Sequence, residues 1–195
     1  KQGIAESLNN IGLIYSNQGD IPKALDYYCK SLKLQEDIGD KPAIANSLNN
    51  IGIIYYNQGD ITKALDYHSR SLKMQEDIGD KKGIANSYNN IGIIYNNQGN
   101  YTLALDNHLK SLRINEEIGD KAGIADSYGN LGSVFTKQKK YSEAKNYLVK
   151  AMDLAKEIGH KEYLKNAYSF MSALDSAQGN YHGAFSNYKL YSALR

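Results

Sequence analysis

Hydrophobic residues recur along the chain every three or four positions, the spacing of one face of an α-helix. The first such stripe runs from Ile4 to Tyr15 and predicts a helix over about residues 3–17. A second stripe begins at Ile21 and predicts a helix that ends at Ile38. The polar positions between the apolar ones favour helices with one buried and one exposed face.

Glycine–aspartate pairs separate the predicted helices. Gly19 stands where a helix end favours a left-handed residue, and Asp20 can cap the helix that follows. In one turn the glycine is replaced by Lys139, and a non-glycine residue in the left-handed conformation costs roughly 1 kcal/mol. We therefore expect tight turns throughout, with an irregular or strained turn at Lys139.

A motif that begins Asn-Asn-Ile-Gly starts at Asn9, Asn49 and Asn89 and returns in weaker form at Gly129 and Ser169, so the period is forty residues. A fixed period of this size indicates helical units that bury their apolar faces by stacking on one another. We predict an all-α fold, a right-handed α-solenoid of five helix pairs in one domain. The expected repeats are residues 1–40, 41–80, 81–120, 121–160 and 161–195.

The composition excludes several classes of function. A net charge of +2 with both signs mixed through every repeat gives no basic face for nucleic acid or anionic lipid. No apolar run is long enough to span a membrane. A single cysteine, Cys29, excludes an intramolecular disulfide and a cysteine-based zinc site.

We also expect no enzymatic activity, cofactor or metal. The sequence contains no phosphate-binding glycine loop and none of the common hydrolase or metalloprotease motifs. His68 and His108 occupy the same position in successive repeats, about 8–10 Å apart, which is too far for two ligands of one zinc ion. We therefore expect both histidines to serve packing.

The chain begins and ends inside predicted helices, so we expect it to be a fragment of a longer protein. The sequence does not fix a compartment.

A set of residues at fixed positions resembles the tetratricopeptide repeat signature: Leu8, Ile11, Gly12, Tyr15, Ala24, Tyr28 and Ser31. The usual repeat has about 34 residues, and the longer unit here is similar to the branch found in kinesin light chain and the adaptor Pins. The segment from Tyr188 to Ser192 resembles the ends of repeat arrays in Bacteroidetes sensor histidine kinases. The resemblance implies an inner groove that holds an extended peptide.

The resemblance also implies that a ladder of asparagines grips the peptide backbone, since a primary amide both donates and accepts hydrogen bonds. The alternative is that these amides bond to neighbouring helices and only join the repeats. The ladder consists of Asn10, Asn50, Asn90 and Asn130.

Further positions should line the same groove with a mixture of aliphatic and amide side chains. Such a surface would suit an extended peptide with alternating aliphatic residues. The alternative is a solvated helical face without a ligand. These positions are Asn46, Asn86, Ile53, Ile93, Asn57, Asn97 and Tyr56.

The sequence thus predicts a protein- or peptide-binding module, the sensing or scaffolding region of a larger signalling protein. Two compartments stay open for it: the cytoplasm, or the periplasm if it belongs to a bacterial membrane sensor. The rival interpretation is a structural spacer or a self-association array with no peptide ligand.

Overall fold

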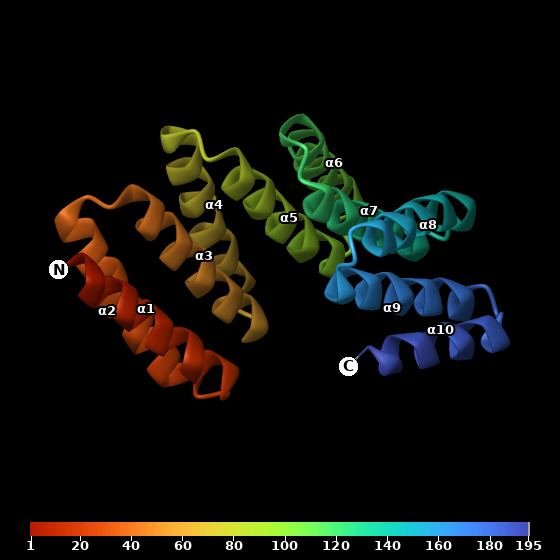
Figure 1. Ribbon diagram of the computed structural model, residues 1–195, viewed down its shortest axis with the longest axis horizontal. Coiled ribbons are helices and arrows are strands. Elements are labelled where there is room, and N and C mark those ends of the chain that lie inside the picture. The colour runs from red at the N-terminus through yellow and green to blue at the C-terminus, as the bar shows by residue number, and fades with distance from the viewer. Residues whose placement is uncertain (195) are drawn as a thin grey trace. The chain divides into compact units, whose positions relative to one another are not determined.

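The computed structural model describes residues 1–194, which form ten α-helices and no strand (Figure 1). The predicted all-α fold is confirmed. The helices are α1 (Gln2–Asn17), α2 (Ile21–Ile38), α3 (Lys41–Asn57), α4 (Ile61–Ile78), α5 (Lys81–Asn97), α6 (Tyr101–Ile118), α7 (Lys121–Lys137), α8 (Tyr141–Glu157), α9 (Lys161–Ala177) and α10 (Tyr181–Ala193).

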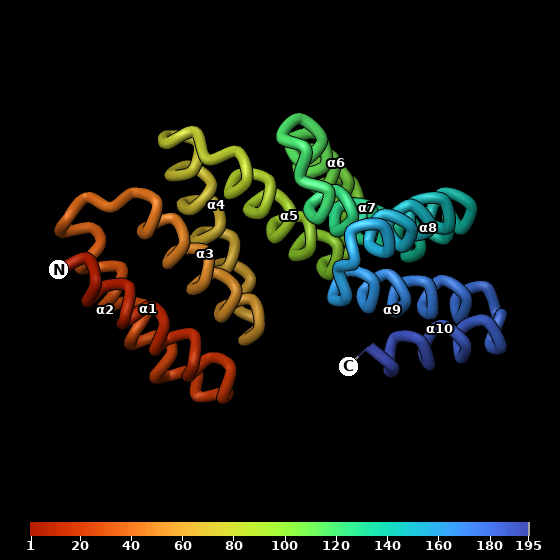
Figure 2. Tube along the Cα trace, viewed as in Figure 1, coloured from red at the N-terminus to blue at the C-terminus, as the bar shows by residue number. Residues whose placement is uncertain are grey.

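Consecutive helices pack as hairpins within two compact units. In the first unit, Lys1–Ile94, α1 packs on α2 and α3 packs on α4. In the second unit, which begins at Tyr95, α7 packs on α8 and α9 packs on α10. The backbone trace in Figure 2 shows the tight turn that closes each hairpin. The packing of consecutive helix pairs makes the fold a tetratricopeptide-like solenoid.

The turns have the predicted geometry. Gly19 is left-handed with φ 78°, and an Asp20 carboxylate oxygen accepts a hydrogen bond from the backbone N–H of Lys23 at 3.3 Å. Lys139 keeps the same left-handed conformation with φ 59°, and Lys140 caps α8 without a side-chain hydrogen bond. The turn without glycine is therefore regular in shape and strained at Lys139.

Glycines in the first helix of a pair bring the second helix close. A Cβ atom added to Gly132 would lie 2.5 Å from a methyl carbon of Leu148, and one added to Gly52 would lie 3.0 Å from the His68 ring. His68 and His108 are 1% and 0% exposed, so the expected packing role of the two histidines is confirmed.

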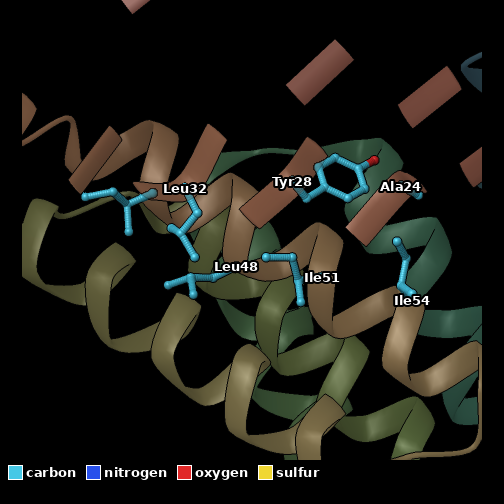
Figure 3. Packing of buried hydrophobic residues seen from close by; sticks show 7 residues of the cluster. Ala24, Tyr28, Leu32, Leu48, Ile51 and Ile54 are labelled. Atoms are coloured by element: carbon cyan, nitrogen blue, oxygen red, sulfur yellow. The ribbon is translucent and has the colours of Figure 1, made fainter. Parts of the chain in front are cut away.

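The apolar core of the first unit joins two successive repeats. Figure 3 shows Tyr28 and Leu32 of α2 in one cluster with Leu48, Ile51 and Ile54 of α3. Each of these side chains is at most 8% exposed. Because the cluster draws on both repeats, neither repeat could bury its apolar face alone.

A chain of buried hydrogen bonds accompanies the apolar cluster. Ser31 donates to the carbonyl oxygen of Ala5 at 2.7 Å, and Gln35 donates to the Ser31 hydroxyl at 3.0 Å. Ser47 of the next repeat then donates to the amide oxygen of Gln35 at 2.8 Å. The chain therefore ties both helices of one repeat to the first helix of the next.

Two of these three bonds recur in the next repeat. Ser71 donates to the carbonyl oxygen of Ala45 at 2.8 Å, and Ser87 donates to Gln75 at 2.7 Å. The position of Gln35 and Gln75 is thus a buried repeat-to-repeat contact.

Replacing Gly132 by alanine should lower the free energy of unfolding by about 1–3 kcal/mol, because the new methyl group collides with Leu148. Chemical unfolding would measure the loss. The control is Gly3→Ala, since a Cβ at Gly3 meets nothing within 4 Å and the helix gains up to about 1 kcal/mol. A stabilised Gly132→Ala variant would contradict the close approach.

Replacing Lys139 by glycine should raise the free energy of unfolding by about 1 kcal/mol, because glycine removes the left-handed strain. Thermal and urea unfolding would show the gain. Lys140→Ala removes the same charge at a residue whose φ is −88°, and it should give no gain because alanine neither relieves strain there nor caps α8. Equal effects of the two changes would argue against strain at Lys139.

Candidate functional site

Two members of the asparagine ladder bond to a neighbouring repeat within the first unit. The Nδ2 atom of Asn90 donates to Oδ1 of Asn49 at 2.9 Å, and Nδ2 of Asn50 donates to Oδ1 of Asn9 at a longer 3.5 Å. Both side chains are half-buried. Their own amide oxygens accept no hydrogen bond from the described residues. One end of each amide is thus fixed, and its oxygen is available.

His68 also contacts Asn49, the acceptor of the first of these two bonds. Its Nδ1 atom lies 3.0 Å from Oδ1 of Asn49, the atom that also accepts from Asn90. Because an amide oxygen only accepts, the imidazole proton is on Nδ1. Residues of α3, α4 and α5 are therefore linked through one oxygen atom.

Burial lowers the pKa of His68 and of His108 to about 4 each. Both imidazoles are therefore neutral at neutral pH, the state in which His68 donates one hydrogen bond from Nδ1.

A cavity of about 220 Å³ opens between α3 and α5 in the first unit. Its lining is mainly aliphatic and aromatic, with two amides and His68. Five of the predicted site residues line this cavity together. The lining consists of Ile53, Tyr56, Asn57, His68, Asn90, Ile93 and Ile94.

A second, more polar cavity of about 450 Å³ lies between α1 and α3. It contains two further predicted residues, Asn10 and Asn46, and several that sequence analysis did not assign to the site. The lining consists of Glu6, Asn9, Asn10, Gln35, Asp40, Pro42, Ala43 and Asn46.

The unassigned residues had other evident roles in the sequence. Asp40 stands at a helix start, and its carboxylate does accept from the backbone N–H of Ala43 at 3.2 Å. Asn9 directly precedes the ladder residue Asn10 in the repeated motif. This pair of adjacent asparagines was the sequence signal that could have assigned Asn9 to the site.

Four predicted site residues are absent from the linings of these two cavities, and one of them is Asn50, whose bond to Asn9 is described above. Asn86 is exposed on α5, and Asn97 accepts a hydrogen bond from Lys137 at 2.9 Å in the second unit. Asn130 is only 7% exposed. The structure therefore concentrates the candidate site in the first unit.

In the second unit the position equivalent to the polar cavity is filled. The pocket beside Asp126 and Asn166 leaves no space for a water molecule. Phe170 replaces the ladder asparagine there, and a Cβ added to Gly129 would lie 3.3 Å from the Phe170 ring. An aromatic side chain thus occupies the space that is open in the first unit.

Other kinds of site find no support in residues 1–194. No group of three or more histidine, cysteine, aspartate or glutamate side chains could hold a metal ion. None of the described helices combines the length and apolar character that crossing a membrane requires. Cys29 is a free, exposed thiol.

The chain belongs to the tetratricopeptide repeat family. The family model matches residues 3–77, 83–157 and 124–195. The family is one of helical repeats that are generally not catalytic. No curated protein matches the chain in sequence.

Solved structures share the fold at low sequence identity. BtubC from P. vanneervenii matches with a TM-score of 0.80 and 17% identity over 100% of this chain and 80% of its own. A kinesin light chain-type repeat protein of Podosopora anserina matches with a TM-score of 0.72 and 13% identity, covering 100% and 96%. A Rap protein complexed with competence and sporulation factor matches with a TM-score of 0.83 and 18% identity, covering 96% and 52%.

Lowering the pH should destabilise the protein through its buried histidines. An unfolded histidine takes up a proton near pH 6.5, whereas His68 and His108 stay neutral down to about pH 4. Between these pH values the unfolded state binds more protons than the folded state. The contribution of the two histidines to the free energy of unfolding is therefore fully present above pH 6.5 and is lost as the pH falls toward 4. Urea unfolding at pH 7.5 and pH 5 should differ by about 2 kcal/mol for each histidine.

The matched control is His108→Leu, because Leu148 occupies the equivalent position in the fourth repeat with 0% exposure. The variant should lose about half of the pH-dependent difference. An undiminished difference would show that the acid sensitivity arises elsewhere.

Proposed function

We propose that the chain is a protein-interaction module that binds an extended peptide on the inner surface of its first unit. The observation that carries the proposal is the cavity between α3 and α5. There Ile53 and Ile93 form an apolar seat beside the Asn90 amide. An apolar pocket with a few fixed polar groups is the usual form of a ligand site.

The ladder amides would bind the peptide backbone. An available amide oxygen can accept a backbone N–H, and the remaining amide hydrogen can donate to a backbone carbonyl. The bonds from Asn50 to Asn9 and from Asn90 to Asn49 hold both amides in place before the ligand arrives. Preorganisation of this kind lowers the entropy lost on binding.

The apolar seat would select side chains. In an extended peptide alternate residues point the same way, so one aliphatic side chain can enter the cavity while its neighbours face water. Ile53 is 39% exposed without a ligand, and burying such a surface favours binding.

Family membership supports this function, and so does the similar Rap protein, which was solved in complex with competence and sporulation factor. In this proposal the chain is the sensing or scaffolding region of a signalling protein.

A structural or self-associating array is the second candidate. It is favoured by α10, where Tyr181 is 74% exposed, Phe185 58% and Tyr188 53%. Aromatic side chains of this size on one helix can mediate contacts between chains.

The ladder provides the test. A random nine-residue peptide library displayed on phage is selected on the intact chain, and an enriched peptide is synthesised. Asn50→Ala with Asn90→Ala should weaken its binding roughly tenfold or more, since each hydrogen bond contributes about 0.5–1.5 kcal/mol. Fluorescence anisotropy measures the affinity, and thermal unfolding measures the accompanying loss of the two repeat-to-repeat bonds.

The control is Gln58→Ala with Gln98→Ala, which removes two exposed primary amides that follow the same helices outside both cavities. It should leave affinity unchanged. If the ladder variant unfolds at a lower temperature yet binds the peptide as tightly as the intact chain, the amides only join repeats and the array interpretation is favoured.

A further inference from the structure

Two carboxylates without a cationic partner line the polar cavity of the first unit. Neither Glu6 nor Asp40 forms an ion pair with any described residue. The cap residue Asp20 differs, because its carboxylate pairs with Lys23 at 2.7 Å. The residue three positions after Asp40 is Ala43, and the lining of this cavity contains no lysine or arginine.

A buried amide in the same cavity has an unused hydrogen. Gln35 is 3% exposed, donates one hydrogen to Ser31 and accepts from Ser47. The second hydrogen of its Nε2 atom has no acceptor among the described residues. Two carboxylates that lack a cation, together with one N–H hydrogen that lacks an acceptor, suit a ligand that brings both a cation and a carbonyl oxygen, as a basic residue of a peptide does.

The volume fits a long side chain. A water molecule occupies about 30 Å³ in the liquid, so a cavity of about 450 Å³ can take a flexible side chain together with its solvent. The equivalent pocket of the second unit, beside Asp126 and Phe170, has no such space. Any preference for a peptide side chain that depends on this polar cavity would therefore be a property of the first unit.

The two open cavities lie on opposite halves of α3. The seven residues from Asn46 in the polar cavity to Ile53 in the apolar one rise about 10 Å along the helix. The step from one helix to the next adds about 8–10 Å across it. The cavities are thus on the order of 14 Å apart, and an extended peptide covers that distance in four to five residues at about 3.3 Å each.

We propose that the first unit selects peptides with a lysine or arginine four to five residues away from an aliphatic side chain. The basic side chain enters the polar cavity between Glu6 and Asp40, and the aliphatic one fills the seat formed by Ile53 and Ile93. The inference rests on the proposed peptide binding and adds the chemistry of the partner.

The test repeats the phage selection with the intact chain and with a Glu6→Gln, Asp40→Asn variant, which keeps the shape and the helix cap but removes both charges. Peptides selected on the intact chain should carry the basic and aliphatic pair at this spacing, in either order. Replacing the basic residue of a selected peptide by norleucine should weaken binding at least tenfold to the intact chain and less than twofold to the variant.

Two further variants complete the design. Asp20→Asn with Glu76→Gln removes the same number of acidic charges outside both cavities and should keep the basic preference. Ile93→Ser, which copies Ser133 of the next repeat, should remove the aliphatic preference and keep the basic one.

The outcomes separate the two proposals. Selected peptides that depend on Asn50 and Asn90 but carry no basic residue would overturn the inference and leave peptide binding intact. The same conclusion would follow if the norleucine replacement weakened binding equally to the intact chain and to the Glu6→Gln, Asp40→Asn variant. Selected peptides that ignore the loss of Asn50 and Asn90 would overturn the proposed function itself.

Discussion

The stacking of helix pairs depends on a chain of buried hydrogen bonds that crosses from one repeat to the next. These hydrogen bonds run from the backbone of α1 to α3 through the side chains of Ser31, Gln35 and Ser47, each of which is at most 3% exposed. Leaving any of these groups unpaired would cost about 1–3 kcal/mol. The apolar cluster around Ile51 supplies the burial, and the polar chain fixes the register in which the repeats meet.

That register determines the inner surface. Because α3 is held against α1 and α5 at set positions, the Asn50 and Asn90 amides bond to the preceding repeat and keep their oxygens available. The same register has another result in the second unit, where Phe170 replaces the ladder asparagine and fills the space beside Gly129. One backbone arrangement therefore leaves the polar cavity open in the first unit and its equivalent filled in the second.

The helices and turns could be predicted because their signals are local. The apolar spacing and the left-handed glycines give the element bounds within a residue or two, and the strain at Lys139 follows from the missing glycine. The site was predicted less completely. That Ile53, Ile93 and Asn90 share a cavity followed from their common helix face. Phe170 closes a pocket because it packs against the preceding repeat, and a local sequence pattern does not predict such a contact.

The buried hydrogen-bond chain also has a consequence for how the array can change in length. Gln35 meets Ser47 in the same way that Gln75 meets Ser87, at 2.8 and 2.7 Å. The joining surfaces of the first three repeats are thus interchangeable, so a gene that lost or gained residues 41–80 would encode an array whose neighbours still match. At the position of Gln35 and Gln75 the third repeat has Asn115, whose amide stands on a shorter side chain and donates to Ser127 at 3.4 Å. Recombination beyond this position would therefore join repeats whose contact residues differ in length.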